Sequence, residues 1–177
     1  VNKYYQLSES YVPDDLVNVS NQHAYGTVQI RKEVYDAFKK MFDAAKKDNV
    51  TLIINSGYRD YASQEKVYNQ YKHLKGEEYA DKYAARPGHS EHQTGLALDI
   101  ITYNTKGEDF DKTEAFKWLS KNAYKYGFVL RYSKEKEEIT GYSYESWHYR
   151  YLGIDLATKV YKSGLSYDEY YAFYEEE

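Results

Sequence analysis

The chain mixes helical and strand patterns without a strict strand–helix–strand alternation, and this mixture limits the folds open to it. Residues 32–48 place Val34, Phe38, Met41, Phe42 and Ala45 at helical spacing, which predicts an amphipathic helix. Further helices are expected at 61–75 and 112–127, and Ser166 with Glu169 forms a capping box. Strands are expected at 50–59, 96–102, 128–132 and 146–153. We therefore predict an α+β fold with a central, mainly antiparallel sheet flanked by helices.

The length of the chain sets the number of domains. With 177 residues and a mass of 20.9 kDa, it can bury one substantial core but cannot comfortably build two. We expect residues 1–177 to form a single domain, with 1–31 as an irregular segment packed on it. Residues 79–95 are expected to be a loop region, and 134–143 a charged hairpin or loop.

Composition excludes several classes of function. The net charge is −4 with the two signs interspersed, so the basic face that nucleic acids require is missing. No apolar run approaches the roughly 20 residues of a membrane span. The chain has no cysteine, which excludes thiol nucleophiles, disulfides and thiolate zinc sites. The 24 tyrosines reflect either compositional bias or a surface that contacts sugars or peptides.

The stretch GHSEHQTGLALDI, residues 88–100, holds the most informative spacing in the sequence. His92 would lie in a loop and Asp99 in the following strand, and both can turn toward one point. Gly95 allows the backbone to bend tightly around it. Neutral imidazole and carboxylate are ligands of catalytic zinc, which takes three protein ligands. Asp99 lies among apolar residues, where an acid is costly to bury without a partner.

The third ligand must come from another segment, and His148 in YESWHYRY is the best candidate. Glu145 lies three residues before it and could remain near the metal without binding it. Such a carboxylate can take a proton from a zinc-activated water and pass it to a leaving amine. Each residue alone has an ordinary alternative, because a single histidine is more often a packed or surface residue than a ligand.

Three segments, SGYRDYASQ, GHSEHQTGLALDI and ESWHYRYLG, resemble in their order and separation the zinc D-alanyl-D-alanine carboxypeptidases of the VanY type. The LdcB-type L,D-carboxypeptidases of the bacterial cell wall share this pattern. The family motif S-x-H-x-x-G-x-A-x-D, followed by E-x-x-H, is matched at every position. YVPDDLV near the start is similar to the opening of these domains, so the resemblance spans nearly the whole chain.

The resemblance implies a role for each matching residue. His92, Asp99 and His148 would bind Zn²⁺ at the floor of an open cleft, and Glu145 would be the catalytic base. Arg59 would stabilise negative charge, either on the tetrahedral oxyanion or on the terminal carboxylate of the substrate; its ordinary alternative is a structural salt bridge. Two further residues match positions that line the pocket for the terminal residue, namely Gln64 and Ser90.

The resemblance implies an enzyme that removes a C-terminal D-alanine from peptidoglycan stem peptides, with D,D- and L,D-specificity both open. An endolysin-type endopeptidase would share the zinc motif, and an inactive zinc-containing wall-binding module is a third possibility. Retention of Glu145 argues against the inactive module. We expect a monomer located outside the cytoplasmic membrane, with any signal or anchor lying before residue 1.

Overall fold

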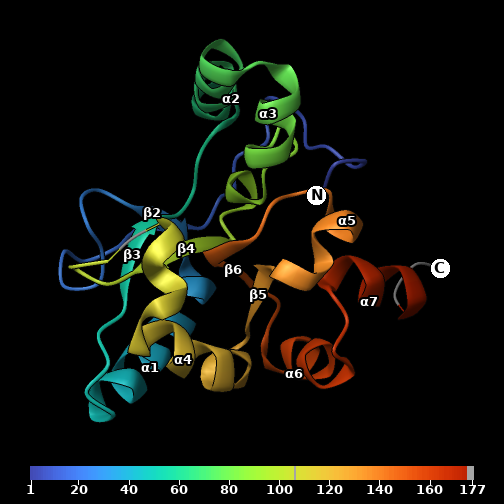
Figure 1. The fold of residues 1–177 in the computed structure, drawn as a ribbon. Coiled ribbons are helices and arrows are strands. Elements are labelled where there is room, and N and C mark those ends of the chain that lie inside the picture. The colour runs from blue at the N-terminus through green and yellow to red at the C-terminus, as the bar shows by residue number, and fades with distance from the viewer. Residues whose placement is uncertain (106, 175–177) are drawn as a thin grey trace.

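A four-stranded antiparallel sheet forms the centre of the molecule in the computed structural model, which describes residues 1–105 and 107–174 (Figure 1). Its strands follow the order β3 (Ile53–Ser56), β4 (Ala97–Ile101), β6 (Glu145–Tyr151) and β5 (Phe128–Tyr132). Every neighbouring pair is antiparallel. The predicted α+β class and antiparallel sheet are therefore confirmed.

The strand register places three polar residues in one row across the sheet. Ser56 of β3 lies opposite Asp99 of β4, and Asp99 lies opposite His148 of β6. Directly opposed residues on neighbouring strands point to the same face. Residues separated by almost a hundred positions in the chain therefore come together because of strand pairing alone.

The main core lies between the sheet and two helices, α1 (Lys32–Lys47) and α4 (Glu114–Asn122). All five apolar residues that predicted the first helix are buried on α1. A second, smaller cluster joins β5 to two C-terminal helices, α6 (Ile154–Ser163) and α7 (Tyr167–Tyr174). Apolar burial on both sides of β5 fixes the edge of the sheet against the C-terminal part of the chain.

Two further helices, α2 (Tyr61–Lys75) and α3 (Glu77–Tyr83), form a lobe above the sheet (Figure 1). Tyr68 of α2 packs against Ala80 and Ala84 in a small separate cluster. The prediction that residues 79–95 form a loop was partly wrong, because this segment contains the end of α3 and the 3₁₀ helix η1 (Glu91–Thr94). Packing on α2 stabilises α3, whose seven residues are too few to hold a helix alone.

In three other segments the observed structure differs from the prediction. The N-terminal segment is not wholly irregular, since β1 (Leu16–Asn18) pairs with β2 (Gln29–Arg31). The charged segment 134–143 is neither hairpin nor plain loop, because it holds α5 (Glu137–Thr140) after the 3₁₀ turn η4 (Lys134–Lys136). The helix expected at 112–127 spans α4 and then tightens into η3 (Ala123–Tyr126) before Gly127, while η2 (Gly107–Lys112) precedes it.

The capping box at the start of α7 is confirmed. The backbone N–H of Ser166 donates to Glu169 Oε2 at 2.7 Å, and the backbone N–H of Glu169 donates to Ser166 Oγ at 3.2 Å.

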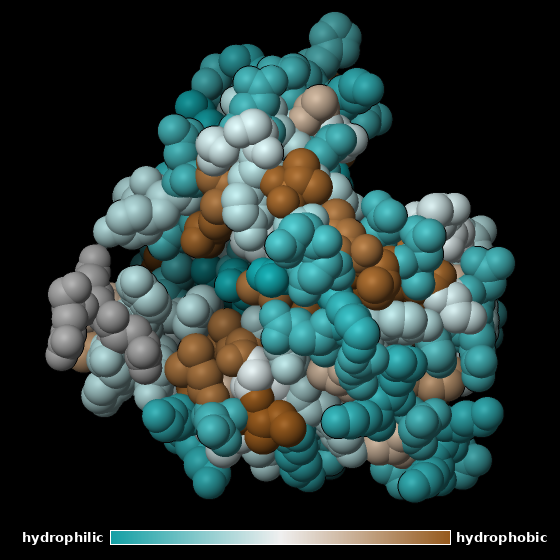
Figure 2. Space-filling model, turned by 180° about the vertical axis from the view of Figure 1, so that it is seen from behind, coloured by the Kyte–Doolittle hydropathy of each residue, from teal (hydrophilic) through white to brown (hydrophobic). Residues whose placement is uncertain are grey.

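On the face in Figure 2, apolar groups are small and separated by hydrophilic surface. Across 1–105 and 107–174, no helix is both long and apolar enough to cross a membrane.

Candidate active site

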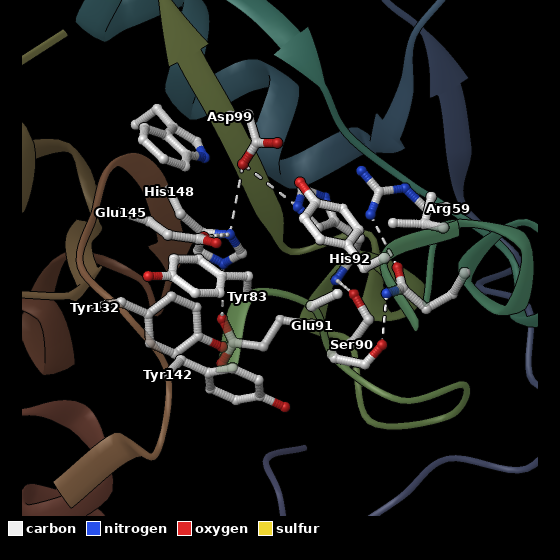
Figure 3. A pocket seen from close by; sticks show the side chains of 16 residues that line it. Arg59, Tyr83, Ser90, Glu91, His92, Asp99, Tyr132, Tyr142, Glu145 and His148 are labelled. Atoms are coloured by element: carbon white, nitrogen blue, oxygen red, sulfur yellow. Dashed lines mark hydrogen bonds and ion pairs between the residues drawn. The ribbon is translucent and has the colours of Figure 1, made fainter. Parts of the chain in front are cut away.

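His92, Asp99 and His148, the three predicted metal ligands, lie together at the sheet (Figure 3). Their potential ligand atoms all lie within 4.8 Å of one another. Asp99 Oδ1 lies 3.4 Å from His92 Nε2 and 3.4 Å from His148 Nδ1. Both imidazoles are buried, and the Asp99 side chain is mostly buried.

The arrangement fits a tetrahedral zinc ion. Zinc–nitrogen and zinc–oxygen bonds of about 2.0–2.2 Å in a tetrahedron separate neighbouring ligand atoms by about 3.3–3.5 Å. The two distances from Asp99 Oδ1 match this separation. The same oxygen is buried and makes no hydrogen bond within the described residues, as expected of an atom that serves as a metal ligand. Two nitrogens and one oxygen are also a donor set that zinc prefers.

The two histidines present different ring nitrogens to this point. His92 Nδ1 lies 2.6 Å from the carbonyl oxygen of Gly57; a carbonyl only accepts, so Nδ1 carries the proton and Nε2 is left to bind metal. His148 is turned the other way, with Nε2 lying 3.3 Å from Glu91 Oε2 and Nδ1 facing Asp99. Hydrogen bonds of this kind orient metal-binding histidines and fix their tautomers.

Local backbone structure explains the position of His92. Ser90 caps η1, and its Oγ accepts from the backbone N–H of His92 at 3.3 Å. Gly95 ends η1 in the left-handed region with φ +67°, which a residue with a side chain adopts at a cost. The chain then enters β4, which carries Asp99. Glycine at 95 therefore makes the tight return from loop to strand possible.

The electrostatics of the ligands are dominated by their mutual contacts. Burial alone would raise the pKa of Asp99, but the neighbouring imidazoles of His92 and His148 hold it far below its usual range. Burial alone would lower the pKa of His148, but Asp99 and Glu91 raise it to about 9. Asp99 is therefore held as a carboxylate between the two imidazoles, the form in which it can bind a cation.

Glu145, the predicted base, begins β6 three residues before His148, and its Oε2 lies 3.4 Å from His148 Nδ1. Burial is the main reason that its pKa is raised to about 7, and the nearby Asp99 and Glu91 carboxylates add to this effect. His148 and Arg59 oppose the shift. A carboxylate with a pKa near neutrality can both accept and return a proton at physiological pH.

The remaining predicted residues line the same cleft (Figure 3), which has a volume of about 180 Å³. Arg59 donates from one terminal nitrogen to Gln64 Oε1 at 2.8 Å and from the other to Ser56 Oγ at 3.1 Å. Gln64 is held by a further bond from its Nε2 to the Ala85 carbonyl at 2.7 Å. Among the described residues Arg59 forms no ion pair with a carboxylate, so the salt-bridge alternative gains no support. Ser90 lies beside them.

Sequence reasoning missed Glu91, which is 1% exposed. Its Oε1 accepts from Arg131 Nε at 2.7 Å and from an Arg150 terminal nitrogen at 2.9 Å. Burial opposes its ionisation, but these two guanidinium groups hold its pKa well below the usual range. The signal available in the sequence was an acid directly before His92. Tyrosines also line the cleft, namely Tyr71, Tyr83, Tyr132 and Tyr142.

Comparison with known proteins adds to this picture. The sequence model described as VanY, D-alanyl-D-alanine carboxypeptidase, matches residues 27–154. A putative carboxypeptidase, YodJ, of Bacillus subtilis strain 168 is 45% identical over 181 residues, which cover 97% of this chain and 65% of the relative. A D-alanyl-D-alanine carboxypeptidase of Enterococcus faecalis is 41% identical over 152 residues, 81% of this chain and 55% of the relative. The chain thus spans somewhat less than two thirds of these relatives.

Solved structures agree with the sequence comparison. The LdcB LD-carboxypeptidase, whose structure was described as revealing peptidoglycan recognition, superposes with a TM-score of 0.91 at 45% identity, covering 97% of this chain and 84% of that chain. A mutant of the vancomycin-resistance D,D-pentapeptidase VanY in complex with Zn(II) has a TM-score of 0.81 at 36% identity, covering 96% of both chains.

Proposed function

The chain belongs to the VanY family of D-alanyl-D-alanine carboxypeptidases, and on that basis we propose that it is a zinc-dependent carboxypeptidase of peptidoglycan stem peptides. His92, Asp99 and His148 would hold the zinc ion, and the reaction would release a C-terminal D-alanine. The observation that carries this proposal is Glu145, a carboxylate 3.4 Å from the metal-facing nitrogen of His148, with a pKa of about 7.

The proposed chemistry divides the work among the residues of the cleft. Zinc, when bound, supplies Lewis acidity that activates water at neutral pH and polarises the scissile carbonyl. Glu145 takes a proton from the attacking water and delivers it to the leaving amine of D-alanine. Arg59, aimed by Gln64 and Ser56, stabilises negative charge, either on the oxyanion or on the terminal carboxylate.

The cleft supports an exopeptidase because the guanidinium group of Arg59 lines the same cleft as the candidate metal ligands. An enzyme that removes the last residue must recognise a free carboxylate, and Arg59, Gln64 and Ser90 are polar groups suited to that task. An endopeptidase would bind peptide on both sides of the cut and would not require this recognition.

The test is D-alanine release from two soluble stem peptides by the zinc-loaded protein, followed by mass spectrometry. One is a pentapeptide ending in D-Ala-D-Ala, and the other a tetrapeptide ending in a single D-Ala. We expect release from at least one peptide by the wild type and none by Glu145→Ala. The preferred peptide then assigns D,D- or L,D-specificity.

The same assay separates the alternatives. A substrate amidated at its C-terminus should resist a carboxypeptidase, whereas efficient cleavage of it would favour the endolysin-type endopeptidase. Stoichiometric zinc binding without cleavage of any peptide would favour the inactive wall-binding module. We further propose that residues 1–177 act as one domain, as a monomer, outside the cytoplasmic membrane where peptidoglycan lies.

A further inference from the structure

A line of alternating charges runs from the candidate metal site to the C-terminal helix. Glu91 contacts His148 on one side and the guanidinium group of Arg131 on the other. Arg131 in turn donates from both terminal nitrogens to Asp168 of α7, at 2.7 and 3.0 Å. Arg150 is a second cation on Glu91. Two carboxylates and two guanidinium groups therefore balance one another behind the site.

Glu91 and Arg131 are almost completely buried, at 1% and 3% exposure. Isolated charges at such positions would be strongly unfavourable, and each depends on its partners. The chemistry assigned to the cleft does not use either residue. Arg131 also contacts the aromatic rings of Tyr132 and Tyr167, which hold the guanidinium group in one orientation.

The direction of the His148 hydrogen bond determines whether this histidine can bind metal. Glu91 Oε1 is paired with the guanidinium groups of Arg131 and Arg150 at 2.7 and 2.9 Å, so Glu91 is a carboxylate whose two oxygens only accept. The His148 nitrogen facing it, Nε2, must therefore carry a proton. In the neutral ring this leaves the lone pair on Nδ1, the nitrogen that faces Asp99. A donor in place of Glu91 Oε2 would favour the opposite tautomer.

We infer that Glu91, held by Arg150 and by Arg131, which Asp168 anchors in turn, is a positioning residue that fixes the metal-binding tautomer of His148. This inference rests on the zinc site and activity proposed above and adds the way in which α7 supports them. Glu91 is neither a ligand nor a catalytic residue, because it acts through His148. The C-terminal helix thereby contributes to metal binding without touching the cleft.

Glu91→Gln is the informative substitution, because its shape is nearly unchanged. Glu91 Oε1 accepts from both guanidinium groups, so the amide oxygen of glutamine would take that position. The amide nitrogen would then face His148 Nε2 and donate to it. His148 would be driven to carry its proton on Nδ1, where the metal should bind.

The experiment measures zinc affinity by competition with a chelator, together with the position of the His148 proton by nitrogen-15 NMR. Wild type loaded with zinc should show a slowly exchanging proton on Nε2. Loss of an outer hydrogen-bond partner commonly weakens metal binding by about 10–100-fold, and we expect this of Glu91→Gln, with loss of the Nε2 proton signal. Glu91→Asp, which remains an acceptor, should recover part of the affinity.

Asp168→Asn provides a second test. It remains informative even if Glu91→Gln, which alters a buried residue beside His148, fails to fold. Asp168 lies at the protein surface, with a side chain 20% exposed. Because it removes charge one step further away, we expect a smaller loss of zinc affinity, about three- to tenfold. The matched control is Asp81→Asn. Asp81 accepts two hydrogen bonds from Arg86, one from Nε and one from a terminal nitrogen. Weakening this other arginine–carboxylate pair should leave the zinc affinity unchanged.

The outcomes separate this inference from the proposed function. A wild type that binds zinc, with Glu91→Gln and Asp168→Asn folded and equal to it in affinity and in the His148 proton signal, would overturn the inference alone. Equal losses in Asp168→Asn and the Asp81→Asn control would also overturn it, because the effect would then be general. A wild type that binds no zinc would overturn both.

Discussion

Glu145 sets the pH dependence expected of the enzyme. It is a base only when ionised, and its pKa of about 7 means that acidification below neutrality protonates it. A bound divalent cation favours the ionised form, so the midpoint should lie at or below pH 7. We therefore expect kcat/KM to fall about tenfold per pH unit below that midpoint. A pH profile of D-alanine release tests this, and faster release at pH 5 than at pH 7 would contradict it.

The same residue should affect stability in the zinc-free protein. A carboxyl whose folded-state pKa is raised from 4.5 to about 7 stabilises the fold when protonated, and this contribution is lost as pH rises through 7. Glu145→Gln removes that pH dependence. At pH 8 we expect the zinc-free variant to be more stable than wild type by on the order of 2–3 kcal/mol, with no difference at pH 4. Urea denaturation at both pH values is the measurement.

Arg59 is the residue through which substrate recognition can be tested. If it binds the terminal carboxylate, Arg59→Ala should raise KM more than it lowers kcat, by about 10–100-fold, the range of a charge-assisted hydrogen bond. Arg86→Ala, which alters an exposed arginine paired with Asp81, is the control and should leave KM unchanged.

An amidated peptide completes the Arg59 experiment. Wild type should lose activity on the amidated peptide, and Arg59→Ala should lose little more, because both changes remove the same interaction. Additive losses would assign Arg59 to the oxyanion instead.

The residues of the site differ in how far they could be predicted. His92, Asp99, Glu145 and His148 stand in a motif; strand pairing places Asp99 opposite His148, and η1 brings His92 to the same point. Glu91 could not be assigned, because its partners Arg131 and Arg150 come from two strands whose alignment is set by the sheet. A buried charge network of this kind has no local pattern in the sequence.

Among the elements, the turn after β3 offers a direct test. A Cβ atom at Gly57 would lie 2.5 Å from the Gln29 carbonyl oxygen and 2.5 Å from Ile30 Cγ2. Gly57→Ala should therefore destabilise the protein by about 1–3 kcal/mol, the usual cost of overpacking. Because the Gly57 carbonyl accepts from His92, zinc affinity should fall as well. Thermal unfolding and zinc titration measure the two effects.

Gly164→Ala is the control for this turn. Its Cβ would meet nothing within 4 Å, although its φ of +70° makes the backbone unfavourable for alanine. It should lose stability through the backbone alone and keep its zinc affinity. Equal zinc affinities in the two variants would show that the Gly57 turn does not orient His92.

Elements with strong periodicity were predicted well, and short ones were not. The spacing of Val34, Phe38 and Met41 defined α1 because one face of that helix is buried along its full length. The short helices α3 and α5 have 7 and 4 residues, too few for a periodic signal. Contacts made elsewhere in the fold stabilise them, and such contacts cannot be read from local sequence.

For the whole molecule, zinc should act as a stabilising ligand. Because the candidate ligands come from η1, β4 and β6, binding would join segments that separate on unfolding. Zinc at about a thousand times its dissociation constant adds about 4 kcal/mol, which for this size corresponds to a rise in Tm on the order of 10 °C. Thermal unfolding with zinc or with chelator tests this. His148→Ala should abolish the rise, and an equal rise in that variant would contradict the site.

The use of Nδ1 by His148 and of Nε2 by His92 has a mechanical consequence. In His148 the metal-facing nitrogen is Nδ1, the ring nitrogen closer to the backbone of β6. In His92 it is Nε2, the ring nitrogen farther from the backbone of η1. A cation at this point would follow the motions of β6, the strand that also carries Glu145. Arg59 and Gln64 lie on the side of the α2–α3 lobe. A displacement of that lobe would therefore move Gln64, the partner of Arg59, without changing the position of Glu145 relative to the cation.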